Sequence, residues 1–210
     1  REKVKGGVQE FSDKTFDEET WAAFAQKIFY LPGNATEADS YRELDEYLAQ
    51  FEQNHANRMY YLSTAPSLYE PTLNKLKETG MADQSKGWRR IVIEKPFGYD
   101  LATAHALNEI VHTTFDESQV YRIDHYLGKE TAQNILYFRF ANTIFEPIWN
   151  RNFITNVQIS VLESVDVGHR ADFYDGAGVM RDMFQNHLMQ LLTLTTMEPP
   201  ISLEADALRD

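Results

Sequence analysis

The chain has 210 residues, of which 43% are hydrophobic, and this composition excludes a disordered or fibrous protein. Its 20 basic and 32 acidic residues give a net charge of −12, which does not favour a nucleic acid or an anionic membrane as partner. The absence of cysteine excludes disulfides, thiolate catalysis and iron–sulfur clusters. Because the chain does not begin with Met, and no signal peptide or apolar membrane span is visible, we expect a cytoplasmic location and a piece of a longer chain.

The first quarter is strongly acidic and predicts two helices. Apolar residues recur at helical spacing from about 17 to 28 and from about 37 to 51. The acidic side chains between 13 and 52 would form either a partner surface or a solvated helix face, and the solvated face is the favoured interpretation.

The middle of the chain alternates between predicted strands and helices. Strands are expected at 58–63, 88–94 and 119–123, with helices that begin near Pro66 and Asp100. This alternation predicts an α/β fold with a parallel, Rossmann-like sheet. Ligands bind such sheets beyond the carboxyl ends of the strands, where polar clusters stand at 94–96 and 124–126.

The pattern changes near residue 150, where we place a domain boundary. The segment 156–161 alternates between polar and apolar residues, which predicts a half-buried strand, and Glu163 continues its apolar parity. A Gly/Asp-rich loop follows, and then a helix over about 179–194 that is apolar on almost all sides and is therefore expected to be buried.

Two polar clusters could carry chemistry. Asp124, His125, Tyr126 and Lys129 stand together at a strand-to-helix turn and suit either a phosphate grip or an ordinary capped turn, without preference. Lys95 could bridge a cofactor and a substrate oxygen, although taken alone a surface lysine is the favoured interpretation.

His187 lies on the apolar helix and suits either a core residue or a general base. Asp124 could accept a hydrogen bond from the imidazole and orient it, but the sequence alone does not place the two together. The six histidines are scattered, so we expect no metal site, and no G-x-S-x-G elbow predicts a serine nucleophile.

Three motifs stand in order along the chain: IEKPFG (93–98), RIDHYLGKE (122–130) and RDMFQNHL (181–188). With FAN (140–142) and FEPIW (145–149), they make the segment from about 57 to 200 resemble the glucose-6-phosphate dehydrogenase family. RIDHYLGKE is specific to that family, whereas EKP also occurs in other sugar dehydrogenases.

The resemblance implies an oxidoreductase that oxidises glucose 6-phosphate at C1 to a lactone and passes the hydride to NADP, the first step of the oxidative pentose phosphate pathway. It implies part of a Rossmann-like NADP-binding domain at 1–150 and, at 151–210, the start of an α+β domain with an antiparallel sheet. It makes His187 the general base, oriented by Asp124. The implied substrate contacts are Lys95, His125, Tyr126, Lys129, Glu163 and Asp182, and the implied cofactor contacts are Lys95, Pro66 and Tyr69.

The chain departs from the family at its N-terminal side, where the G-x-x-G-D-L-A turn that cradles the cofactor is missing. We therefore expect the 210-residue chain to be inactive alone and the full-length protein to be a homo-oligomer. One alternative is a non-catalytic sugar-phosphate-binding or interaction module. Another is a related sugar dehydrogenase with a different substrate, but HYLGK, the implied phosphate grip, argues against it.

Overall fold

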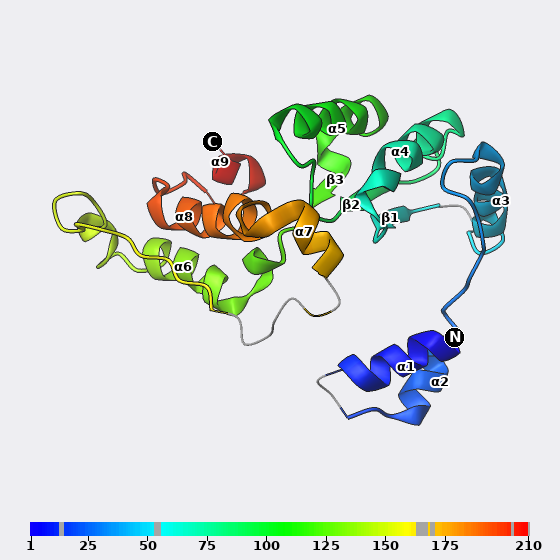
Figure 1. The fold of residues 1–210 in the computed structure, drawn as a ribbon, viewed down its shortest axis with the longest axis horizontal. Helices are drawn as coiled ribbons and strands as arrows, with labels where there is room; N and C mark the ends of the chain where they lie inside the picture. Colours follow the sequence, from blue (N-terminus) through cyan, green and yellow to red (C-terminus); the bar gives the residue numbers. More distant parts are fainter. Residues whose placement is uncertain (13–14, 53–55, 163–167, 169–170, 203, 210) are drawn as a thin grey trace.

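A computed structural model of the chain contains a small parallel sheet flanked by helices (Figure 1). The structure describes residues 1–12, 15–52, 56–162, 168, 171–202 and 204–209. The strands are β1 (Arg58–Leu62), β2 (Arg89–Ile93) and β3 (Val120–Arg122); they lie in the order β1-β2-β3, with both neighbouring pairs parallel. The predicted Rossmann-like sheet is therefore confirmed.

The last three residues of the middle strand are buried on both faces of the sheet. Ile91, Val92 and Ile93 form a continuous apolar run and are all buried, as is typical of a central parallel strand. On the face that carries Val92, the flanking Tyr61 and Tyr121 remain about half exposed. The apolar core therefore lies on the opposite face.

Two helices cover that opposite face and pack against each other (Figure 1). They are α4 (Tyr69–Glu78), which continues from the short 3₁₀ turn η1 (Pro66–Leu68), and α5 (Leu101–Thr114). Their side chains enter the same core as the strands; fully buried members include Leu73, Leu76, Val111, Ile91 and Ile93.

The start of α5 is held by reciprocal hydrogen bonds. Asp100 Oδ1 accepts from the Thr103 amide at 2.8 Å, and Thr103 Oγ1 accepts from the Asp100 amide at 3.1 Å. Just before this cap, Gly98 has a φ of +77°, and a Cβ there would come within 2.5 Å of the backbone nitrogen of Ala104. The loop from β2 into α5 is thus tightly fixed.

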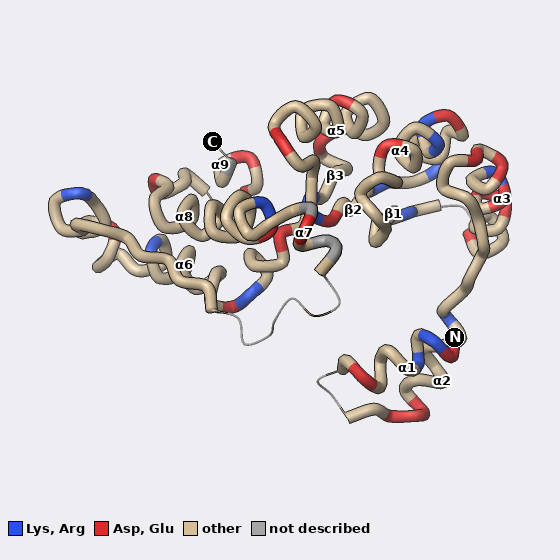
Figure 2. Tube along the Cα trace, in the orientation of Figure 1, with Lys and Arg blue, Asp and Glu red and all other residues tan. Residues whose placement is uncertain are grey.

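The N-terminal helices lie at one end of the molecule. They are α1 (Glu2–Phe11), α2 (Glu18–Ala25) and α3 (Ala38–Ala49), so the two predicted helices are slightly shorter than expected and α1 was not predicted. No residue of α1 is buried, which explains its weak sequence signal. Figure 2 shows acidic positions along α2 and α3, and the 92% exposure of the Asp39 side chain supports the solvated-face interpretation.

The regular elements described in the second half of the chain are helices and helical turns. In order it contains η3 (His125–Gly128), α6 (Glu130–Phe140), η4 (Glu146–Ile148), α7 (Ala171–Val179), the π-helix η6 (Met180–Leu188), α8 (Met189–Thr196) and α9 (Ala205–Arg209). Helices α6 and α8 lie side by side. Across the described ranges, no helix is long and apolar enough to cross a membrane.

Two predictions for this half are wrong. The predicted strand at 156–161 does not form, because a strand needs ladder partners and none is paired with these residues among those that the structure describes. The helix from Val179 onward is also not buried all round, since Met180, Phe184 and Met189 are each about half exposed. Packing against α6 and the strand ends covers only part of its apolar surface.

Candidate active site

Lys95 and Asp124 lie beside each other at the carboxyl edge of the sheet. Ile93 of β2 is in register with Arg122 of β3, and each is followed two residues later by one of these polar side chains. The amide of Ile123 also donates to the carbonyl of Ile93 at 3.0 Å, which continues the pairing past the strand. Since neighbouring strands lie about 4.8 Å apart, the register brings the two side chains to one place.

The π-helix η6 crosses this edge and supplies a partner for each residue. Lys95 Nζ donates to the carboxylate of Asp182 at 2.8 Å and to its backbone carbonyl at 2.9 Å. His187 Nδ1 lies 2.5 Å from Asp124 Oδ1. Asp182 and His187 are buried, at 5% and 0% exposure. The two segments that the sequence could not place together therefore meet.

His187 is arranged as a neutral imidazole. A carboxylate accepts hydrogen bonds, so Nδ1 carries the proton that is shared with Asp124, and Nε2 keeps its lone pair. Burial lowers the pKa of His187, and the hydrogen bond that Nδ1 donates to Asp124 opposes this shift. No hydrogen-bond partner for the buried Nε2 is found among the described residues. An imidazole of this kind is suited to accept a proton.

The other side of the imidazole is lined by the short turn η3. The ring of Tyr126 stacks on that of His187 at 4.1 Å and 17°, and the His125 ring meets it edge-on at 4.6 Å. Lys129 places Nζ 3.7 Å from the centre of the Tyr126 ring. Tyr126 is buried, whereas His125 and Lys129 are exposed. This turn thus presents a cation and an imidazole to solvent beside the buried pair.

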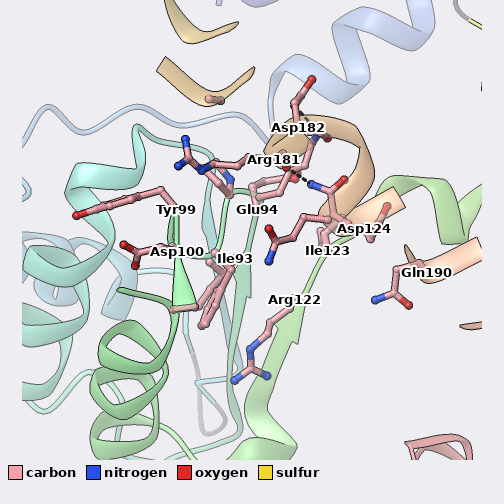
Figure 3. A pocket seen from close by; sticks show the side chains of 18 of the residues that line it. Ile93, Glu94, Tyr99, Asp100, Arg122, Ile123, Asp124, Arg181, Asp182 and Gln190 are labelled. Carbon is pink, nitrogen blue, oxygen red and sulfur yellow. Dashed lines mark hydrogen bonds and ion pairs between the residues drawn. The ribbon is translucent and has the colours of Figure 1, made fainter. Parts of the chain in front are cut away.

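A cavity of about 690 Å³ opens between the strand ends, the start of α5 and η6. Figure 3 shows its labelled side chains, which come from β2 and β3, from the loop before α5 and from the helix. Lys95, Asp124 and Asp182 all line it. Arg122 also lines the cavity, although it was not predicted as a site residue. Residues two apart on a strand point to the same face of the sheet, so its position two residues before Asp124 could have indicated this.

The remaining predicted residues lie farther from this centre or outside the described ranges. Pro66 is exposed at the start of η1, just beyond β1. Tyr69 is only 1% exposed, and its hydroxyl donates to the carbonyl of Glu94 at 3.2 Å. The proposed cofactor contacts of both stay predictions. Glu163 lies outside the described residues.

Comparison with known families assigns the chain to a protein family. The family model "Glucose-6-phosphate dehydrogenase, NAD binding domain" matches residues 1–134, and "Glucose-6-phosphate dehydrogenase, C-terminal domain" matches residues 136–210. The chain belongs to the glucose-6-phosphate dehydrogenase family. The resemblance inferred from the three motifs is therefore confirmed.

Relatives named glucose-6-phosphate 1-dehydrogenase agree with this family assignment. The protein of Aggregatibacter actinomycetemcomitans is 47% identical to this chain, and the match covers 89% of this chain and 38% of the relative. The protein of Bacillus subtilis is 44% identical, and the match covers 100% of this chain and 42% of the relative. The crystal structure of the enzyme from Mycobacterium avium matches with a TM-score of 0.88 at 34% identity. The match covers 100% of this chain and 44% of the Mycobacterium avium chain.

A second solved structure is described as glucose-6-phosphate dehydrogenase in complex with its substrate glucose-6-phosphate. It matches with a TM-score of 0.87 at 36% identity, and the match covers 100% of this chain and 44% of the chain in that structure. The chain thus spans about two fifths of the length of the family members that it matches.

Proposed function

We propose that the intact protein that carries this chain oxidises glucose 6-phosphate at C1 to 6-phosphogluconolactone, with hydride transfer to NADP. The observation that carries the proposal is the buried His187, which is bonded to Asp124 through Nδ1 and has an unbonded Nε2 in the described structure. The names of the relatives and of the substrate complex support the same reaction.

In this reaction, His187 takes the proton of the C1 hydroxyl on Nε2. The C1–O bond becomes the lactone carbonyl as the hydride leaves C1, and Asp124 stabilises the imidazolium that forms. NADP, when bound, supplies the hydride acceptor. His187 is then the catalytic base and Asp124 the residue that orients it.

The substrate is held on both sides of this base. We assign the phosphate and neighbouring sugar oxygens to His125, Tyr126 and Lys129, because a cation and an imidazole suit a phosphate dianion. Lys95 and Asp182 form an ion pair at the sheet edge and offer a donor and an acceptor to sugar hydroxyls. Glu163 is assigned to a sugar hydroxyl from the family motif alone.

The cofactor would lie along the carboxyl edge of the sheet, where parallel sheets bind ligands. The residues present fit one side of it: Lys95 offers an ammonium there, and Pro66 is exposed beyond β1. Tyr69 is buried, so its contribution would be indirect: its hydroxyl holds the Glu94 carbonyl next to Lys95.

We further propose that residues 1–150 belong to the cofactor-binding domain and residues 151–210 to the start of the substrate domain. The full-length protein is proposed to be a cytoplasmic homo-oligomer that acts in the pentose phosphate pathway.

The test is an absorbance assay for NADPH with the intact protein and with the 210-residue chain. We expect turnover by the intact protein with glucose 6-phosphate and little with unphosphorylated glucose. Equal rates with both sugars would contradict the phosphate site at His125 and Lys129. Sustained turnover by the 210-residue chain alone would contradict its expected inactivity.

A further inference from the structure

The helix that carries the proposed base is wound as a π-helix over nine residues, Met180–Leu188. An α-helix has 3.6 residues per turn, so two positions five apart face about 140° away from each other. A π-helix joins residues five apart by hydrogen bonds, so these positions lie on one face. The wide winding therefore turns Asp182 and His187, five apart, to the same side.

That shared face is needed because the strand edge presents two partners at once. Lys95 and Asp124 each lie two residues beyond the register pair Ile93–Arg122, on neighbouring strands. The helix meets both, through Asp182 and His187 respectively. In an ordinary α-helix with this sequence, one of the two contacts would be lost.

Side-chain hydrogen bonds reinforce the wide turn from within. Asn186 Nδ2 donates to the carbonyl of Arg181 at 3.1 Å, and its Oδ1 accepts from the amide of His187 at 2.6 Å. Lys95 Nζ donates to the carbonyl of Asp182 at 2.9 Å. Asn186 thus links a backbone carbonyl five residues earlier to the amide of the base itself.

We propose that Asn186 is a positioning residue, whose two hydrogen bonds hold the π-helical turn so that His187 reaches Asp124 while Asp182 reaches Lys95. The kinetic part of this inference rests on the proposed function. Its structural part, the contact between His187 and Asp124, does not.

The kinetic test uses the intact protein with Asn186→Ala, Asn186→Asp and the matched control Asn134→Ala. Asn134 is an exposed asparagine on α6. A base displaced by about an ångström costs on the order of 10²-fold, so we expect Asn186→Ala to lower kcat by that factor with KM nearly unchanged. Asn186→Asp keeps an oxygen for the His187 amide and should recover at least about tenfold of this loss. Asn134→Ala should match the wild type.

The structural test is proton NMR of the same variants, which needs no activity. A buried imidazole N–H bonded to a carboxylate should give a slowly exchanging downfield signal, assigned by its absence in His187→Asn. We expect Asn186→Ala to lose this signal and Asn134→Ala to keep it. An unchanged signal and wild-type kcat in Asn186→Ala would overturn the proposal.

The two tests also separate the two proposals. If the wild-type intact protein does not reduce NADP with glucose 6-phosphate, the proposed function fails, and the NMR comparison still decides the role of Asn186. If Asn186→Ala does not fold, the nearly isosteric Asn186→Asp decides it, because its signal and kcat should then lie between those of the wild type and His187→Asn. Wild-type values of both in Asn186→Asp would overturn the need for the Nδ2 bond to Arg181.

Discussion

His187 Nδ1 lies 2.5 Å from Asp124 Oδ1, although the two residues are 63 positions apart in the chain. One comes from the turn that follows β3 and the other from the π-helix η6. The contact fixes the tautomer of a buried imidazole and leaves Nε2 unbonded in the described structure. The chemistry proposed for this chain depends on that single relationship more than on any other.

Replacement of His187 by Asn tests the base. Asn keeps a polar side chain of similar size near Asp124 but accepts no proton at the position of Nε2. Loss of a general base costs about 10²–10⁴-fold in rate, so we expect kcat to fall within that range while KM for glucose 6-phosphate changes little. Steady-state kinetics of the intact protein check this, and near-normal turnover would remove His187 from the mechanism.

The buried imidazole should also make stability depend on pH. Burial lowers the pKa of His187 below its ordinary value of 6.5, so between these two values the unfolded state binds more protons than the folded state. The stabilising contribution is therefore fully present above pH 6.5 and is lost as the pH falls below it. Urea unfolding at about pH 8 and about pH 5 should show a smaller pH dependence in His187→Asn.

The matched control for this measurement is His105→Asn, since His105 lies exposed on α5. We expect it to keep the pH dependence of the wild type. The same dependence in all three proteins would show that His187 is not the group responsible.

The buried ion pair between Lys95 and Asp182 should stabilise the fold more than the exposed ion pair between Lys75 and Glu78. The side chain of Asp182 is only 4% exposed and that of Lys95 21%. Lys95→Met removes the lysine partner of this buried carboxylate, and breaking a buried ion pair by removing one partner typically costs about 3–5 kcal/mol. Lys75→Met removes the exposed pair with Glu78 and should cost about 0.3–0.5 kcal/mol. Denaturant unfolding of both variants compares them, and similar losses would contradict the buried character of the first pair.

Arg139 should hold α6 against the end of α8. It is buried, and its two terminal nitrogens each donate at 2.7 Å to a backbone carbonyl, those of Leu194 and Met197. Arg139→Met leaves both carbonyls without this partner, and a hydrogen bond to a charged group contributes about 1.5–3 kcal/mol. We expect a loss of at least about 2 kcal/mol in thermal or urea unfolding. Arg42→Met is the control, since Arg42 is an exposed residue of α3, and equal losses in both variants would refute the role of Arg139.

Much of the parallel sheet was predictable because its signals are local. The run 91–93 is apolar on both faces, and Asp100 and Thr103 form a cap that is visible in the sequence. The site was only partly predictable. Lys95 and Asp124 could be placed at one sheet edge from strand order, but their contacts with Asp182 and His187 depend on how a distant helix docks.

Two features could not be predicted correctly from local signals. The residue pattern of Met180–Leu188 also suits an α-helix, so its π-helical winding could not be predicted from the sequence alone. The strand prediction at 156–161 failed for another reason: the alternation there has the period of a strand, but a strand forms only with neighbours that complete its hydrogen bonds.

The register between β2 and β3 has a consequence for how the site assembles during folding. Bringing two distant segments together has an entropic cost that rises slowly with the length of the loop. The pairing of Ile93 with Arg122 already sets Lys95 beside Asp124. When η6 docks on this edge, it therefore forms its contacts with Lys95 and Asp124 together, and only the one long loop that leads to η6 has to be closed. The two halves of the site should therefore appear in the same kinetic step.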